Sequence, residues 1–180
     1  RQMCIRDRGK DSIDKYQYDG IDIDFETAAD HLGPLNTTPG LFKKFCEELS
    51  QYIGPKSGTG RLFLIDGNID ALDQGIAELC NYGVSQAYGC SSATMGYTSL
   101  TSRTASAERV GWKADQLIFT ENFESYWKSG GRPHTTLSGE QMMSLQGMAD
   151  FAVNGTSCGF GAYHMEYELS LIHISEPTRL

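Results

Sequence analysis

Within residues 18–26, the stretch 21–26 combines three acidic side chains with three large apolar ones in strict alternation. If this stretch is an extended strand, Asp22, Asp24 and Glu26 fall on one face, and the apolar side chains between them fall on the other. Consecutive carboxyl groups are then about 7 Å apart along the strand, and like charges at this spacing resist joint ionisation. We therefore expect at least one raised pKa in this row. A carboxyl group that keeps its proton near neutral pH can act as a general acid.

Two other interpretations of this acidic stretch fit its pattern less well. A calcium loop of the EF-hand type has its glycine after three alternating acidic positions and a glutamate six residues later, whereas Gly20 comes before them. A solvated strand face would not need the large apolar side chains that alternate with the acids. A strand that is apolar on one side and acidic on the other is typical of a barrel wall that faces an enclosed site. Glu26 would then lie at the C-terminal end of the strand, where barrel enzymes have their active sites.

The elements that must position this strand alternate along the chain between apolar strands and amphipathic helices. Beyond the acidic stretch, apolar runs predict strands at residues 61–65, 84–88, 116–120 and 159–167. Helical spacing predicts helices at residues 39–53, 69–82 and 139–153, and a partly helical segment at residues 101–112. This order is typical of a parallel sheet with helices outside it.

The predicted fold class is α/β, and the pattern favours a (β/α) barrel over a dinucleotide-binding sheet. No strand is followed by the Gly-x-Gly-x-x-Gly turn that binds a dinucleotide. A complete TIM barrel needs eight strands and about 250 residues, but only five strands are recognisable in these 180 residues. We therefore expect a partial (β/α)8 barrel that comprises roughly strands four to eight.

Both ends of the chain are predicted to be foreign to this domain. Residues 3–7 can be encoded by a DNA string whose reverse complement encodes residues 170–174. One short element that is read from opposite strands at the two ends resembles sequencing-adapter carry-over. We therefore expect residues 9–169 to be the C-terminal part of the barrel, an internal fragment of a longer protein, and residues 1–8 and 170–180 to be non-native.

Composition argues against several classes of function. The net charge of −8 argues against nucleic acid and anionic membranes as partners. With 39% hydrophobic and 11% aromatic residues, the chain is expected to be globular. No apolar run is long enough for a membrane-spanning helix. The cysteines outside the two ends lack the spacing of metal ligands, and we expect neither a metal nor a cofactor.

The acidic strand also carries a known motif. Asp19-Gly20-x-Asp22-x-Asp24-x-Glu26 resembles the D-G-x-D-x-D-x-E signature of glycoside hydrolase family 18, the family of the chitinases and endo-β-N-acetylglucosaminidases. Every defining position of the signature is present, and the resemblance extends more diffusely over residues 16–168. In that family the motif occupies the fourth strand of a (β/α)8 barrel, which agrees with the position expected from the order of elements.

The resemblance implies substrate-assisted hydrolysis with retention of configuration, an exception to the usual scheme with two carboxylates. In this mechanism Glu26 protonates the glycosidic oxygen and later activates water. The 2-acetamido carbonyl of the substrate attacks the anomeric carbon and forms an oxazolinium ion, which Asp24 stabilises through the acetamido N–H. Asp22 lies deeper and shares a proton with Asp24.

Residues at the ends of the later strands are candidates for binding sugar. Gln86 and Tyr88 have the same parity and would both face into the barrel, and the family commonly has a tyrosine at this place that donates to the acetamido carbonyl. Glu121 and Asn122, at the end of the seventh strand, could line the cleft or make contacts within a loop. Tyr163 of the last strand, or the histidine that follows it, could stack on sugar or pack against the protein.

Two departures from the chitinases favour the endo-β-N-acetylglucosaminidases, which cut the chitobiose core of N-linked glycans. Gly89 follows Tyr88 where many chitinases have aspartate. Larger chitinases insert an α+β module between the last two strands, whereas here only residues 121–157 lie there, and most of them are predicted to form one helix. A chitinase and a non-catalytic glycan-binding barrel remain as alternatives.

The resemblance to the endo-β-N-acetylglucosaminidases also implies a binding partner and a cellular location for the parent protein. The partner is expected to be an N-acetylglucosamine-containing glycan or glycoprotein that is cleaved at a β-1,4 linkage. The parent protein is expected to be secreted or located at the cell surface, although the chain carries no signal segment. The fragment alone is expected to be inactive, because an open sector of a barrel leaves two sheet edges unpaired.

Overall fold

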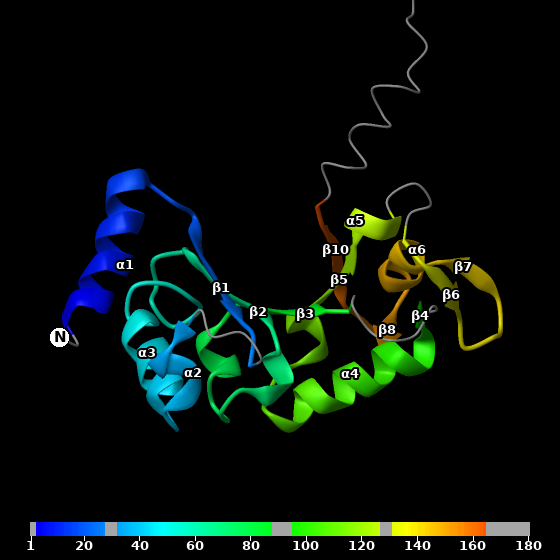
Figure 1. Cartoon of the computed structure of the whole chain (residues 1–180), viewed down its shortest axis with the longest axis horizontal. Coiled ribbons are helices and arrows are strands. Elements are labelled where there is room, and N and C mark those ends of the chain that lie inside the picture. The colour runs from blue at the N-terminus through cyan, green and yellow to red at the C-terminus, as the bar shows by residue number, and fades with distance from the viewer. Residues whose placement is uncertain (1–2, 28–31, 88–94, 127–130, 165–180) are drawn as a thin grey trace, which may run out of the picture.

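The centre of the structure is a five-stranded parallel sheet. The computed structural model describes residues 3–27, 32–87, 95–126 and 131–164. The strands follow one another in space in the order β1 (Gly20–Phe25), β2 (Leu62–Gly67), β3 (Tyr82–Gln86), β5 (Leu117–Asn122) and β10 (Gly159–Tyr163) (Figure 1). Doubly wound sheets reverse their strand order at a switch point, whereas the strands of a (β/α) barrel keep the order of the chain. The predicted partial barrel is therefore confirmed.

The remaining elements connect these strands. The α-helices are α1 (Met3–Tyr16), α2 (Pro34–Thr37), α3 (Leu41–Leu49), α4 (Tyr97–Arg109), α5 (Phe123–Tyr126) and α6 (Ser144–Ala149). Short 3₁₀ helices are η2 (Ile69–Ala71), η3 (Ala77–Leu79) and η4 (Ala114–Gln116). Two small sheets contain β4 (Met95–Gly96), β6 (Pro133–Thr135) and β7 (Gln141–Met143), and β8 (Ala152–Val153) with β9 (Thr156–Ser157). None of the helices in the described part of the chain has the length and apolar composition that a membrane crossing requires.

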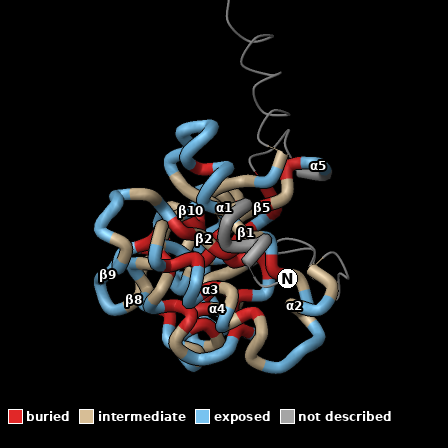
Figure 2. The backbone as a smooth tube through the Cα atoms, turned by 90° about the vertical axis from the view of Figure 1, so that its left-hand side faces the viewer, coloured by how far each residue is buried: buried red, intermediate tan, exposed pale blue. Residues whose placement is uncertain are grey.

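One face of the main sheet is buried against helices. Phe25, Phe63, Ile65 and Phe119 belong to this face, and each is at most 7% exposed. The ring of Phe25 lies 4.6 Å from the ring of Phe42 in α3. The buried segments run through the strands and continue into α3 and α4 (Figure 2), and each fully buried side chain of this size contributes about 2 kcal/mol. Because the apolar half of β1 belongs to this core, its acidic half must face the other way.

Two glycines allow β1 and β2 to approach closely at the two ends of their pairing. Gly20 is in register with Leu62, and Gly67 is in register with Phe25. A Cβ atom on Gly20 would lie 2.2 Å from the carbonyl oxygen of Leu62, and one on Gly67 would lie 2.4 Å from the carbonyl oxygen of Phe25. Gly67 also has a φ of 108°, which residues with a side chain rarely adopt. The glycine that follows Asp19 in the acidic stretch is therefore needed for the packing of the strand pair that carries the acids.

Replacing Gly20 by alanine is expected to lower the free energy of unfolding by about 2 kcal/mol, because the new methyl group would push the backbone of β2 away. Urea unfolding measures the loss. Gly161→Ala is a matched control in the same sheet, since a Cβ atom at this position would lie 3.5 Å from Cγ2 of Thr120, which is an ordinary contact. An equal loss in the two variants would contradict the close-approach argument.

The prediction of a helix at residues 69–82 is wrong. This segment forms only the 3₁₀ turns η2 and η3, because the chain is extended at Leu72 and has a left-handed conformation at Gly75, with φ at 91°. Ile69, Leu72 and Ile76 are nevertheless buried in the core. The apolar spacing therefore identified the buried side chains correctly but not the backbone that presents them.

The other predicted helices differ in extent. Residues 139–153 contain β7, α6 and β8 instead of one helix, and β7 pairs with β6. The connection between β5 and β10 is thus a mixture of short strands and helices. The helix predicted at residues 39–53 is α3, which begins one residue after the left-handed Gly40. The segment at residues 101–112 belongs mainly to α4, which begins earlier, at Tyr97.

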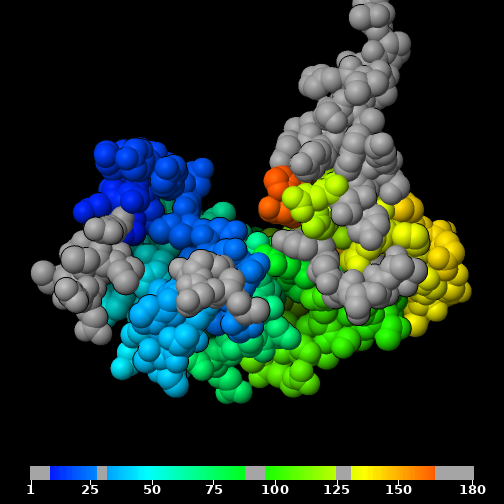
Figure 3. Space-filling model, in the orientation of Figure 1, coloured from blue at the N-terminus to red at the C-terminus, as the bar shows by residue number. Residues whose placement is uncertain are grey.

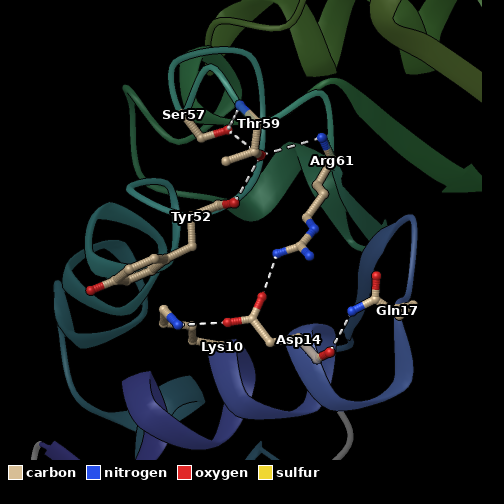
Figure 4. Close-up of polar contacts among 7 residues, drawn as sticks. All are labelled: Lys10, Asp14, Gln17, Tyr52, Ser57, Thr59 and Arg61. Atoms are coloured by element: carbon tan, nitrogen blue, oxygen red, sulfur yellow. Dashed lines mark hydrogen bonds and ion pairs between the residues drawn. The ribbon is translucent and has the colours of Figure 1, made fainter.

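A polar network joins α1 to the loop that leads into β2 (Figure 4). Asp14 of α1 accepts from Lys10 at 2.5 Å and from Arg61 at 2.8 Å. Thr59 donates its hydroxyl to the carbonyl oxygen of Tyr52 at 3.0 Å, which holds the loop that presents Arg61. Hydrogen bonds from Lys10 and then from Arg61 lower the pKa of Asp14. Such exposed pairs contribute little to stability, but they fix the helix from which the chain enters β1.

Candidate active site

The face of the sheet opposite the core carries acidic side chains. Asp22 and Asp24 of β1 are exposed, while Ile21 and Ile23 pack against the core. The register places Asp66 of β2 beside Asp24, and Val84 of β3 beside Asp66. The surface between α1 and the end of β10 is hollowed (Figure 3). The acids therefore line the inner wall of a barrel sector that is open to solvent.

Asp66 and Gln86 complete the surroundings of Asp24. Adjacent parallel strands are about 4.8 Å apart, so the in-register carboxyl groups of Asp24 and Asp66 are neighbours. Gln86, the last residue of β3, donates through Nε2 to Oδ1 of Asp24 at 3.5 Å. Oδ1 of Asp66 is buried and has no hydrogen-bond partner among the described residues. We call Asp22, Asp24 and Asp66 the acid row.

Burial raises pKa values in the acid row. The pKa of Asp66 is raised to about 6, mainly by burial; a hydrogen bond from Gln86 partly offsets this rise, and the charges of Asp22 and Asp24 add to it. The pKa of Asp22 is also raised, first by burial and then by the charge of Asp24. The pKa of Asp22 is therefore raised as expected, although burial contributes more than the repulsion between like charges. Asp22 keeps contact with solvent, which screens the effect.

Replacing Asp66 by asparagine is expected to stabilise the fold at pH 8 but not at pH 4. Between the ordinary carboxyl pKa of about 4 and the folded value of about 6, the folded state binds more protons than the unfolded state. Stability therefore falls as the pH rises through this window, by about 2 kcal/mol once the undiscounted value of about 3 kcal/mol is reduced for screening by solvent. Asparagine cannot ionise, so this loss should disappear in urea unfolding at the two pH values. Asp70→Asn, outside the acid row, is the control, and an unchanged pH dependence in Asp66→Asn would contradict the assignment.

Glu26 follows β1 directly, and hydrogen bonds from two other segments fix the backbone around it. Asn36 donates through Nδ2 to the carbonyl oxygen of Glu26 at 2.9 Å. The side-chain oxygen of Asn68 accepts from the backbone N–H of Thr27 at 2.8 Å. The backbone N–H of Asn68 donates to the carbonyl oxygen of Phe25, also at 2.8 Å. The segment after β2 therefore holds the turn that carries the expected general acid.

Asp66 and Asn68 are not among the residues that the acidic motif and the later strand ends predict for the site. A signal was nevertheless present, because Asp66-Gly67-Asn68 directly follows a buried apolar run, at the end of a strand. In barrel enzymes, polar residues at the C-terminal ends of strands belong to the active site. The apolar run alone indicates only a buried strand. The polar residues after it indicate an active site only once this strand is known to lie beside the acidic strand.

Two of the predicted sugar-binding residues lie together at one edge of the sheet. Tyr163 of β10 is in register with Asn122 of β5, and its side chain is 46% exposed. The ring of His164 lies 4.0 Å from the ring of Tyr163. An exposed aromatic ring has an apolar face on which a sugar can stack. Sugar binding stays a prediction for Gln86, Asn122 and Tyr163, and Tyr88 lies outside the described residues.

Glu121 is buried on the core side of the sheet, away from the acid row. Its side chain is 0% exposed, and its Oε2 accepts from Nε of Arg132 at 3.1 Å and from the hydroxyl of Ser144. Arg132, which is 2% exposed, also donates through Nη2 to the carbonyl oxygen of Ala87 at 2.6 Å. Neighbouring residues on a strand point to opposite faces, so Glu121 and Asn122 cannot both line the cleft. The geometry favours contacts within the protein for Glu121.

Other features of the surface do not point to a different chemistry. Within the described ranges, no group of three or more His, Cys, Asp or Glu side chains could hold a metal ion. A groove of about 550 Å³ runs along α4 and is lined mainly by hydroxyl groups, with Asp70 and Arg103 beside them. No member of the acid row contributes to this groove. The candidate active site is therefore the acid row with Gln86 and Glu26.

Comparisons with known proteins agree with this geometry. A family model described as glycoside hydrolase family 18, BT1044-like, matches residues 4–174. Over 85 residues the chain is 39% identical to endo-β-N-acetylglucosaminidase F2 of Elizabethkingia meningoseptica, a match that covers 46% of this chain and 24% of that protein.

Solved structures share the fold. A selenomethionine variant of BT1044 superposes with a TM-score of 0.71 at 27% identity, covering 88% of this chain and 50% of that one. A variant of the endo-β-N-acetylglucosaminidase from Cordyceps militaris, in complex with fucosyl-N-acetylglucosamine-Asn, superposes with a TM-score of 0.60 at 21% identity, covering 90% of this chain and 52% of that one. The chain thus spans about half the length of these structures and about a quarter of the curated relative.

Proposed function

Because the chain belongs to glycoside hydrolase family 18, we propose that the complete protein is an endo-β-N-acetylglucosaminidase that cleaves the β-1,4 linkage in the chitobiose core of N-linked glycans. The observation that carries this proposal is the acid row on the open face of the barrel sector, with Glu26 directly after it at the end of β1. Relatives that are named endo-β-N-acetylglucosaminidases support the substrate class.

In the proposed first step, the acetamido carbonyl oxygen of the substrate attacks the anomeric carbon. The bond from this carbon to the glycosidic oxygen breaks, and Glu26 gives its proton to the departing oxygen. The product on the enzyme side is an oxazolinium ion, so the protein forms no covalent bond to the sugar. In the second step the Glu26 carboxylate takes a proton from water, and the water oxygen opens the ring at the anomeric carbon with net retention.

The acid row would stabilise the positive charge of this intermediate. Asp24 would accept a hydrogen bond from the acetamido N–H, which orients the carbonyl oxygen for attack and balances the developing charge. Asp22, whose pKa is raised by burial and by Asp24, would share a proton with Asp24 and keep two neighbouring carboxyl groups from ionising together. Gln86 already donates to Asp24 and would hold it in place.

A substrate panel tests the proposed function on the complete gene product that contains this chain. High-mannose glycoprotein, complex-type glycoprotein and chito-oligosaccharide are incubated separately, and the released glycans are identified by mass spectrometry. We expect release of N-glycans with one N-acetylglucosamine left on the protein. In NMR spectra of fresh product the β-anomer should appear first. Cleavage of chito-oligosaccharide alone would identify a chitinase instead, and binding without cleavage would identify a glycan-binding barrel.

We also expect the chain by itself to be inactive, because the acid row then lies on an open surface and the opposite barrel wall that would enclose the sugar is absent. Hydrolysis of a glycoprotein by the isolated chain at a rate similar to that of the complete gene product would contradict this expectation. For the complete protein we propose secretion or a location at the cell surface. Fractionation of cells and medium tests it, and recovery in the cytoplasm alone would contradict it.

A further inference from the structure

The acid row has a member that does not belong to the D-G-x-D-x-D-x-E motif. Asp66 comes from β2, 42 positions after Asp24 in the chain, and the register of the sheet places the two side by side. The backbone is also close at this point, since a Cβ atom on Gly67 would lie 3.4 Å from Oδ1 of Asp24. Asp66 and Gly67, at the end of β2, therefore both lie close to Asp24.

We propose that Asp66 is a positioning residue for Asp24, to which it donates a hydrogen bond from a carboxyl group that keeps its proton in the working enzyme. This inference rests on the proposed function, in which Asp24 holds the acetamido group of the substrate. Asp66 would touch Asp24 and not the sugar.

The surroundings of Asp66 favour a protonated carboxyl group. The groups that act on it are Asp22 and Asp24 from β1, Gln86 from β3 and the backbone N–H of Gly67. The side chains in this set are carboxyl groups or a neutral amide, so their charges oppose ionisation of Asp66. Its buried Oδ1 has no partner among the described residues. A proton shared with a neighbouring carboxylate relieves both the repulsion and the unsatisfied atom.

The proposed proton gives Asp24 a second donor from the neighbouring strands of the sheet. Gln86 donates to Oδ1 of Asp24 from β3, and protonated Asp66 would donate to it from β2. Two fixed donors hold a carboxylate in one rotamer and keep it ionised, as required for a group that accepts from the acetamido N–H. When Asp66 loses its proton, it becomes an acceptor and repels Asp24. The wild-type kcat/KM is therefore expected to fall as the pH rises through about 6, the raised pKa of Asp66.

The test compares Asp66→Asn, Asp66→Ala and Asp70→Asn with the wild type in the complete gene product. Asparagine is neutral at every pH and keeps an N–H donor. In Asp66→Asn, the fraction of the pH 5 activity that is retained at pH 7.5 should rise about tenfold. Asp66→Ala should lose about tenfold in kcat at pH 5, with KM nearly unchanged, because Asp24 loses one of its donors. Asp70→Asn carries the same change outside the acid row and should match the wild type.

A measurement without turnover separates this inference from the proposed function. Carboxyl carbons of ¹³C-labelled aspartate are titrated by NMR, and the signal of Asp66 is identified by its absence in Asp66→Asn. The signal should titrate near pH 6 in the wild type and at lower pH in Asp24→Asn. If no glycan is cleaved at any pH, the proposed function fails and this titration still decides the protonation of Asp66. Titration of Asp66 at the ordinary carboxyl value of about 4, or parallel pH profiles for the wild type and Asp66→Asn, would overturn the inference.

Discussion

Replacing Glu26 by glutamine should lower kcat on an N-linked glycoprotein by about a thousandfold, which is within the range that general acid–base catalysis contributes. Glutamine has nearly the same shape but cannot give a proton to the glycosidic oxygen. The backbone around Glu26 is fixed by Asn36 and Asn68, so the turn should keep its conformation. Binding of the glycan, measured by calorimetry, should therefore change little. Initial rates of glycan release measure the effect on kcat.

The identity of the leaving group makes this test more specific. A nitrophenolate leaves without a proton, so hydrolysis of an N-glycan core in which nitrophenolate replaces the second N-acetylglucosamine should lose much less activity in Glu26→Gln than hydrolysis of the glycoprotein. Glu48→Gln is the matched control, because it makes the same change on the exposed surface of α3. Similar losses on the two substrates would contradict the role of Glu26 as the acid of the first step.

The second large effect concerns the buried ion pair of Arg132 and Glu121. Arg132→Met should lower the free energy of unfolding by about 3–5 kcal/mol, because it leaves the Glu121 carboxylate buried without its charged partner. It also removes the donor to the carbonyl oxygen of Ala87. Urea unfolding measures the loss. The double variant with Glu121→Leu should be more stable than Arg132→Met alone, since it no longer buries an unpaired charge.

A surface ion pair provides the control for this experiment. Arg61→Met removes the partner of Asp14, whose side chain is 44% exposed, and should cost far less than Arg132→Met. If Arg132→Met cost no more than Arg61→Met, the buried pair would not be the stabilising contact that the geometry indicates.

Alternation along single strands predicted much of the fold and the centre of the site. The alternation of apolar and acidic residues over positions 21–26 separated the core face of β1 from its acidic face. The order of the apolar runs predicted the parallel sheet with the correct strand order. Both are local properties of the sequence, because neighbours on a strand must point to opposite faces. The same rule explains why the side chains of Glu121 and Asn122 lie on opposite faces of the sheet, since consecutive residues of a strand cannot share a face.

Features that depend on contacts between strands could not be read in this way. The sequence places Asp66 at the end of an apolar run, but Asp66 joins the acid row only because β2 pairs with β1 in one particular register, and the spacing of the sequence does not specify that register. The segment at residues 69–82 has the apolar spacing of a helix, but Gly75 turns the chain and the tertiary packing of its apolar residues replaces helical hydrogen bonds. The partner of Glu121 could not be predicted either, because Arg132 lies 11 positions later in the irregular connection between β5 and β10, where no repeating spacing indicates which side chains meet.

The most direct test of the whole account is a crystal structure of the complete gene product, as the Glu26→Gln variant, with an N-glycan bound through its chitobiose core. We expect the acetamido N–H of the sugar that is cleaved to lie within hydrogen-bond distance of Asp24, with the glycosidic oxygen next to the side chain at position 26. Asp66 should contact Asp24 and not the sugar. A glycan bound elsewhere on the barrel, with the acid row in contact only with water, would contradict the account.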